Sequence, residues 1–136
     1  MVKIIMGQKG SGKTKQLIEL VNKAIDEEQG DVVCLEKGAK LKYDIPHKAR
    51  LIEASEHDFN GYNFLKGFIS GLYSANYDIT HIFINRLLKI VGEDVNEKME
   101  EFFDWCESFS KREGVKFTIS VSADMALASD AVKKYF

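Results

Sequence analysis

The chain has 136 residues, the length of one ordinary domain, and 45% of them are apolar, which is enough to bury a core. Its 19 basic and 21 acidic side chains give a formal net charge of −2, which excludes a general electrostatic attraction to nucleic acid or to membranes. The sequence shows neither an apolar run of membrane-spanning length nor a signal peptide, so we expect one soluble, cytoplasmic domain over residues 1–136.

Segments with the composition of strands and segments with the periodicity of helices alternate along the chain. In chain order the sequence predicts strand 2–6, helix 14–28, strand 31–35, strand 49–52, helix 59–74, strand 79–84, helix 94–113, strand 115–121 and a short last helix from Asp124 through Tyr135. This order favours βαβ units, whose parallel strands are covered by helices on both faces. We therefore expect an α/β fold with three layers, α/β/α, and a mostly parallel sheet of about five strands, with the first strand central.

Three smaller features carry expectations of their own. The polar segment 36–48 reads as a surface loop, with a short strand over 41–43. Gly67 and Gly71 stand one helical turn apart, which favours close packing of that helix against a neighbour. The two cysteines, Cys34 and Cys106, have neither a C-x-x-C pattern nor metal-ligand spacing to a histidine, so we expect two buried, reduced thiols.

Glycines are concentrated in a short segment between the first predicted strand and the first predicted helix. The segment Gly7-Gln8-Lys9-Gly10-Ser11-Gly12-Lys13-Thr14, called the glycine loop below, fits the pattern G-x-x-x-x-G-K-[ST]. Glycines allow a tight curl in which successive backbone N–H groups converge on a phosphate, and the helix N-terminus points its positive end at the same anion. Lys13 would reach the β and γ phosphates, and the Thr14 hydroxyl would hold Mg²⁺.

This loop, with a strand before it and a helix after it, resembles the Walker A motif of the P-loop NTPase superfamily. The chain is similar to small single-domain ATP-binding proteins with a minimal RecA-like or twitching-motility-type ATPase core. The resemblance implies ATP and Mg²⁺ as cofactors and a RecA-like strand order, with strand 115–121 between the first strand and strand 79–84. The residues that it places around the phosphates are Gly7, Gln8, Lys9, Gly10, Ser11, Gly12, Lys13, Thr14 and Lys15.

The same resemblance predicts a strand that ends in an acidic residue beside the magnesium ion. The matching strand, Ile82-Phe83-Ile84, is followed by Asn85 instead. Asparagine can hydrogen-bond a metal-bound water but offers no negative charge, so this departure argues against tight Mg²⁺ binding and fast hydrolysis. On this interpretation, Asn85→Asp should strengthen Mg²⁺-dependent nucleotide binding.

Several polar residues at predicted strand ends are candidates for the remaining chemistry, because ligands bind outside the carboxyl ends of parallel strands. Glu36 and Glu53 each follow a strand and are candidate catalytic bases; Glu36 resembles in position the glutamate of RecA-like ATPases. Ser120 and Ser122 are candidates for sensing the γ-phosphate, and Arg86 for contacting phosphate or reaching a neighbouring subunit. For each of these, an ordinary solvated or ion-paired side chain is the alternative.

Three functions remain open on the sequence. The first is a nucleoside triphosphate-binding protein with slow ATP hydrolysis. The second is a small-molecule kinase, such as a nucleoside or nucleotide kinase, although the arginine-rich lid and zinc-binding cysteines of such enzymes are missing. The third is a non-catalytic nucleotide-binding switch or interaction module, which Asn85 favours. A second copy of the chain or another protein partner is left open.

Overall fold

Five parallel strands form one sheet, and the computed structural model describes residues 1–39, 41–57 and 59–136. The strands are β1 (Val2–Gly7), β2 (Asp31–Glu36), β3 (Ala49–Glu53), β4 (Ile79–Ile84) and β5 (Lys116–Ser122). Their order across the sheet is β1-β5-β4-β2-β3, and every pair is parallel. This confirms the parallel sheet and the RecA-like placement of β5 between β1 and β4.

The predicted central position of the first strand is wrong. In the described chain β1 lies at one edge of the sheet and pairs with β5 alone, because the other four strands all lie on the β5 side. The C-terminal segment covers part of this edge, where the Ile4 N–H donates a 2.8 Å hydrogen bond to the Tyr135 carbonyl. The glycine loop therefore follows an edge strand and lies at the carboxyl end of that strand.

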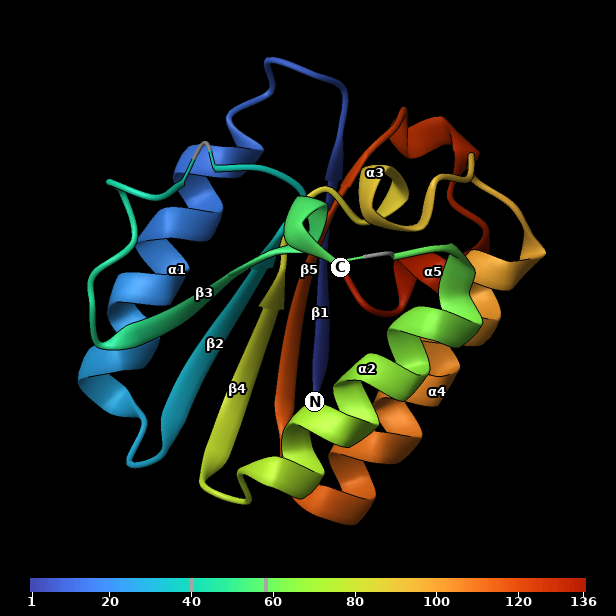
Figure 1. Cartoon of the computed structure of the whole chain (residues 1–136). Coiled ribbons are helices and arrows are strands. Elements are labelled where there is room, and N and C mark those ends of the chain that lie inside the picture. The colour runs from blue at the N-terminus through green and yellow to red at the C-terminus, as the bar shows by residue number, and fades with distance from the viewer. Residues whose placement is uncertain (40, 58) are drawn as a thin grey trace.

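Helices cover both faces of the sheet and make the expected three layers (Figure 1). Helix α1 (Lys13–Glu27) lies alone on one face, whereas α2 (Gly61–Ala75) and α4 (Glu97–Glu113) lie side by side on the other. The buried cluster under α1 comprises Leu17, Val21, Ala24, Val32, Cys34, Leu41, Ile45, Ala49 and Phe83. Apolar residues at helical spacing thus attach α1 to the sheet and fix where its N-terminus lies.

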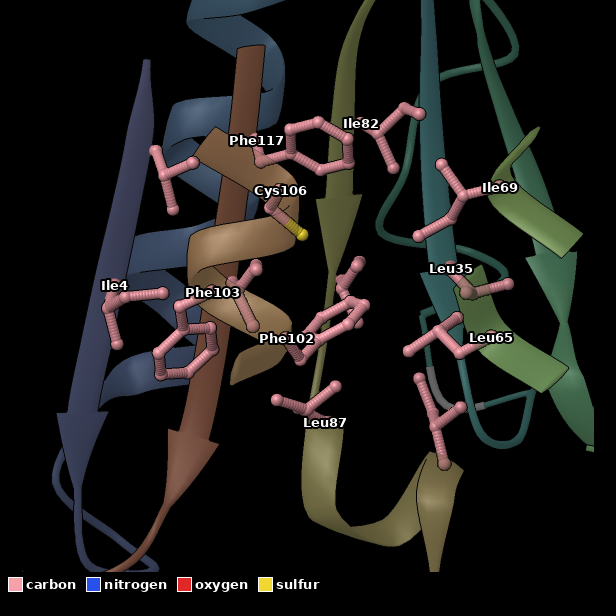
Figure 2. Close-up of a cluster of buried hydrophobic side chains, with 14 of the residues drawn as sticks. Ile4, Leu35, Leu65, Ile69, Ile82, Leu87, Phe102, Phe103, Cys106 and Phe117 are labelled. Carbon is pink, nitrogen blue, oxygen red and sulfur yellow. The ribbon is translucent and has the colours of Figure 1, made fainter. Parts of the chain in front are cut away.

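The larger part of the core lies between the sheet and the helices α2 and α4. Figure 2 shows Leu65 and Ile69 of α2 and Phe102, Phe103 and Cys106 of α4 directed toward strand residues. Apolar residues at helical spacing along α4 are buried against the sheet: Met99, Phe102, Cys106 and Phe109. Both cysteines are buried and free, as expected, and burial raises the pKa of the Cys34 thiol to about 12.

Short elements complete the chain and refine the predicted boundaries. They are the 3₁₀ turns η1 (Ala54–Glu56) and η2 (Met125–Leu127) and the short helices α3 (Leu87–Val91) and α5 (Asp130–Lys133). Asp124 caps η2 by accepting a 2.9 Å bond from the Ala126 N–H, and Ser129 caps α5, so the single last helix predicted there is divided. The sequence analysis missed α3, which has only five residues.

Two local predictions are wrong. Residues 41–43 form a turn and no strand, with the Ile45 N–H bonded to the Leu41 carbonyl at 3.0 Å; Lys40, in the same predicted loop, lies outside the described residues. Gly67 and Gly71 are exposed, and an added Cβ at either one meets no described atom within 4 Å. Close packing therefore does not explain these two glycines. In the part of the chain that is described, no helix has the length and apolarity needed to cross a bilayer.

Candidate functional site

The glycine loop connects β1 to α1 at the carboxyl end of the sheet (Figure 1). Gly10 and Gly12 have φ angles of 89° and 86°, a left-handed conformation that other residues rarely adopt. Gly12 is the N-cap of α1 and has no side chain that could accept a hydrogen bond from the first N–H groups of the helix. The first turn of α1 carries no acidic residue. The positive end of the helix is thus left available to an external anion.

Contacts with neighbouring segments hold the loop in shape. The Gly7 carbonyl accepts a 3.1 Å bond from the Ala123 N–H after β5, and Gln8 Nε2 donates to Asp124 Oδ2 at 3.2 Å. Ser11 folds over Gly7 so closely that a Cβ on Gly7 would lie 2.6 Å from Ser11 Oγ. A side chain at position 7 would force Ser11 Oγ to move, and hydrogen bonds attach the loop to the segment that follows β5.

The Lys13 side chain lies inside the loop and is only 9% exposed. Its Nζ donates to the Gln8 carbonyl at 2.9 Å and to Ser11 Oγ at 3.4 Å. Partial burial lowers the pKa of Lys13 from its usual value. The ammonium group therefore sits among neutral oxygens, where an anion would be a stronger partner.

A cavity of about 350 Å³ opens beside the loop. Its lining brings together the glycine loop, the carboxyl ends of β2 and β4, and the turn after β2: Lys9, Gly10, Gly12, Lys13, Thr14, Lys15, Glu36, Leu41, Asn85, Arg86 and Ser122. Four of these side chains are cationic and one is a carboxylate. The excess of positive charge suits a polyanion of several phosphates.

Glu36 ends β2 and is fully buried at the base of this cavity. Its Oε1 accepts hydrogen bonds from Arg86 Nε at 3.1 Å, from Arg86 Nη2 and from the Lys37 N–H at 3.0 Å, and its Oε2 accepts one from Asn85 Nδ2. A buried carboxylate is costly without such donors, and here every donor is supplied by the protein.

Asn85, Arg86 and Ser120 extend this arrangement across β4 and β5. Ser120 Oγ donates to Asn85 Oδ1 at 2.6 Å and accepts from the Arg86 N–H at 2.8 Å. Arg86 has a φ of 54° and is the one non-glycine residue with positive φ among those described. We call Glu36, Asn85, Arg86 and Ser120 the site cluster. The three hydrogen bonds that Asn85 and Arg86 donate to Glu36 link the ends of β2 and β4.

The structure separates the two candidate bases. Glu36 lines the cavity, whereas Glu53, its register partner at the end of β3, lines a different cavity of about 900 Å³ beside His57 and Phe68. Thr14 and Ser122 line the cavity of the glycine loop, and Ser120 is buried behind Asn85. Of the five predicted residues in this paragraph, all but Glu53 therefore line the cavity of the glycine loop or lie next to its lining.

Two contributions were missed on the sequence. Leu41 is a buried cavity-lining residue, and its only sequence signal is one apolar residue inside a polar segment. The ion pair of Arg86 with Glu36 joins residues that are 50 positions apart, so no local sequence pattern predicts it.

The oxygen donors around the cavity fit a hard cation. A hydroxyl from Thr14, an amide oxygen from Asn85 and a carboxylate from Glu36 belong to residues of one lining, and such oxygens are the ligands that Mg²⁺ prefers. The described residues contain no group of three or more His, Cys, Asp or Glu that could hold a metal by themselves. A magnesium ion here would keep water and phosphate oxygens in its shell.

Comparisons with known proteins support the fold. The sequence matches no protein-family model, and no curated protein matches it. Among solved structures, the chain is similar to the flagellar accessory protein FlaH from Methanocaldococcus jannaschii, with a TM-score of 0.60 and 13% sequence identity. The match covers 98% of this chain and 65% of the FlaH chain. At this identity the likeness shows a shared α/β fold.

Proposed function

We propose that this domain binds a nucleoside triphosphate, ATP together with Mg²⁺, in the cavity beside the glycine loop. The observation that carries the proposal is the position of the Lys13 ammonium, which is enclosed by the loop at the uncapped N-terminus of α1. Lys13, the backbone amides of the loop and the start of α1 then act on the same phosphates. Lys9 and Lys15 add positive charge at the mouth of the cavity.

Mg²⁺ would neutralise part of the phosphate charge. The Thr14 hydroxyl is the direct protein ligand we assign to it, and Asn85 would hold one of its waters. The negative charge that Asn85 lacks is supplied by Glu36, whose carboxylate is hydrogen-bonded to the Asn85 amide. The acidic residue that is missing at the end of β4 is therefore replaced by one at the end of the neighbouring strand β2.

Hydrolysis should be slow. Glu36 is the cavity-lining carboxylate and thus the candidate base, but its oxygens already accept bonds from Arg86, Asn85 and the Lys37 N–H. A carboxylate held in this way has little capacity left to orient an attacking water. We expect turnover at about 10⁻³ s⁻¹ or below, the scale of P-loop proteins whose catalytic set is incomplete.

The test is a calorimetric titration of the folded chain with ATP in the presence and absence of Mg²⁺. Saturable binding that Mg²⁺ strengthens is expected, and Lys13→Ala should weaken it about 10- to 100-fold, as loss of a charge-assisted contact does. Lys23→Ala is the matched control on the same helix and should change binding about threefold or less, because Lys23 is exposed and does not line the cavity. Absence of heat with ATP, or equal effects of the two variants, would refute the proposal.

A second cavity favours phosphoryl transfer to a small acceptor as an alternative function. It measures about 330 Å³, shares Arg86 and Ser122 with the first, and is also lined by Lys89, Glu93 and Asp94. An acceptor hydroxyl bound there would lie next to the terminal phosphate. Transfer of labelled γ-phosphate from ATP to a nucleoside or a sugar, in place of release to water, would select this alternative.

A further inference from the structure

Arg86 stands between two negative groups, one present in the protein and one supplied by the proposed ligand. Its guanidinium is paired with Glu36, and the same side chain lines the cavity of the glycine loop. The Arg86 side chain is 15% exposed and that of Glu36 is 0% exposed. Of the two partners, only the guanidinium can therefore turn toward the cavity without a rearrangement of the core.

The backbone of Arg86 is fixed at both ends, which leaves the side chain as the moving part. Its N–H is held by Ser120 Oγ at 2.8 Å, and its φ of 54° is tolerated only because its surroundings impose it. The next residue, Leu87, begins α3 and is fully buried in the core (Figure 2). The guanidinium can therefore move toward the cavity while the backbone of Arg86 stays in place.

We propose that Arg86 makes the site selective for triphosphate over diphosphate, by leaving Glu36 to bind the terminal phosphate. This inference rests on the proposed function and assigns to Arg86 the discrimination between nucleotides with three and with two phosphates. A guanidinium donates two parallel hydrogen bonds to a phosphate as it does to a carboxylate, so the geometry of the pair is transferable. A diphosphate lacks the terminal phosphate that Arg86 would bind, so the pair with Glu36 would then stay closed.

The exchange balances charge at Glu36. When Arg86 leaves, the buried carboxylate keeps its bonds from Asn85 Nδ2 and the Lys37 N–H but loses its cation. Glu36 would then face the charge of a Mg²⁺ ion bound together with the nucleotide, which would replace that of Arg86. No covalent bond forms or breaks in this step. Glu36 passes from one cation to another, and Arg86 passes from one anion to another.

The first experiment compares affinities for Mg²⁺ with ADP and for Mg²⁺ with a non-hydrolysable triphosphate analogue. The unmodified chain should bind the triphosphate at least about 10-fold more tightly, the scale of one bidentate contact. Because Arg86→Ala leaves Glu36 without its cation and can unfold the chain, the main variant is the pair Arg86→Ala with Glu36→Gln, which removes both charges. Its preference for triphosphate over diphosphate should fall to about 1, because the loss of the Glu36 charge acts on both nucleotides and the loss of Arg86 acts on the triphosphate alone.

Arg112→Ala is the control for loss of an arginine, since Arg112 is exposed on α4 and pairs with Glu113. It should keep the full preference. A double variant that keeps the preference, or an unmodified chain without one, would overturn the inference and leave the proposed function standing. Absence of binding to either nucleotide would remove the proposed function itself.

A second measurement needs no variant. The side-chain Nε–Hε resonance of Arg86, followed by NMR, should shift when the triphosphate analogue and Mg²⁺ are added and should stay in place with ADP and Mg²⁺. An equal shift with both nucleotides, or a shift with neither, contradicts the proposed movement of Arg86.

Discussion

Strands β4 and β5 carry a buried polar cluster at each end, and the two clusters differ in what surrounds them. At the carboxyl ends lies the site cluster, with Asn85 after β4 and Ser120 on β5. At the amino ends, His81 of β4 bonds Thr118 of β5 at 2.9 Å through Nε2 and Glu28 at 3.3 Å through Nδ1. Lys116 Nζ completes this amino-end cluster by donating to Glu28 at 2.9 Å.

The two clusters have similar chemistry and different neighbours. His81 stacks on Phe83 with ring centroids 4.1 Å apart, and no residue of the amino-end cluster lines the cavity beside the glycine loop or the cavity that shares Arg86 with it. The site cluster lies beside a cavity lined by four cationic side chains. A buried polar cluster therefore indicates a ligand site only where open space and excess charge accompany it. The amino-end cluster joins strands β4 and β5, whereas the site cluster holds the Arg86–Glu36 pair beside a cavity.

The two clusters should differ most in how much stability the protein loses when the central carboxylate of each is removed. Glu36→Ala leaves the Arg86 guanidinium and the Asn85 amide without an acceptor in a buried setting, and should lower the free energy of unfolding by about 3–5 kcal/mol. Glu28→Ala affects Lys116, which is half exposed, and should cost about 1 kcal/mol. Urea unfolding at pH 7 measures both. Equal losses would mean that the two clusters do not differ as described.

Asn85→Asp tests the site cluster in the opposite direction, by adding a charge. The sequence alone predicts stronger Mg²⁺-dependent binding, but the structure places the new carboxylate against Glu36. Two carboxylates in contact should lower the free energy of unfolding by about 2–4 kcal/mol without Mg²⁺. Millimolar Mg²⁺ with ATP should restore part of this loss, seen as a rise in melting temperature larger than in the unmodified chain. A fully stable variant without Mg²⁺ would contradict the contact.

The amino-end cluster should make stability depend on pH. Burial lowers the pKa of His81 to about 4, although Glu28 acts to raise it. Between pH 6.5 and 4 the unfolded chain binds a proton that the folded chain does not, so stability is complete above pH 6.5 and falls as the pH is lowered. The expected loss from His81 by pH 5 is about 2 kcal/mol. His81→Gln, measured by urea unfolding at pH 7.5 and pH 5, should remove most of that difference.

A matched pair on β5 gives the smallest effect. Ser120→Ala removes the acceptor of the Arg86 N–H and a donor to Asn85, and should cost about 2 kcal/mol. Thr118→Val keeps the shape of the side chain, loses one bond to His81 and should cost about 1 kcal/mol. Only Ser120→Ala should also weaken the preference for triphosphate, because the backbone of Arg86 then loses the hydrogen bond that holds it. A change in that preference with Thr118→Val would argue against a purely structural amino-end cluster.

Local patterns predict most of this fold. Five apolar strands, three long helices and the alternation between them follow from residue periodicity, and so does the parallel sheet. The edge position of β1 does not follow from local patterns, because strand order depends on pairing between segments that are far apart in the sequence, such as β1 and β5. The glycine loop is visible in the sequence because its glycines, lysine and threonine recur at the spacing of a known pattern.

The site is predicted less completely, for the same physical reason. Glu36 and Glu53 carry one local signal, a carboxylate after an apolar strand, and only the strand order separates them. The partner of Arg86 is equally invisible before the fold brings β2 beside β4. Gly67 and Gly71 show the converse, a strong local pattern with no contact behind it.

The central claim is that the glycine loop receives the phosphates of a nucleotide, and the backbone amide spectrum tests it most directly. On titration with ATP and Mg²⁺, the amide resonances of Gly10, Gly12, Lys13 and Thr14 should shift in a saturable way. Those of His81 and Thr118, at the other end of the same sheet, should stay in place. Unmoved loop amides, or shifts of equal size at both ends, would contradict this account.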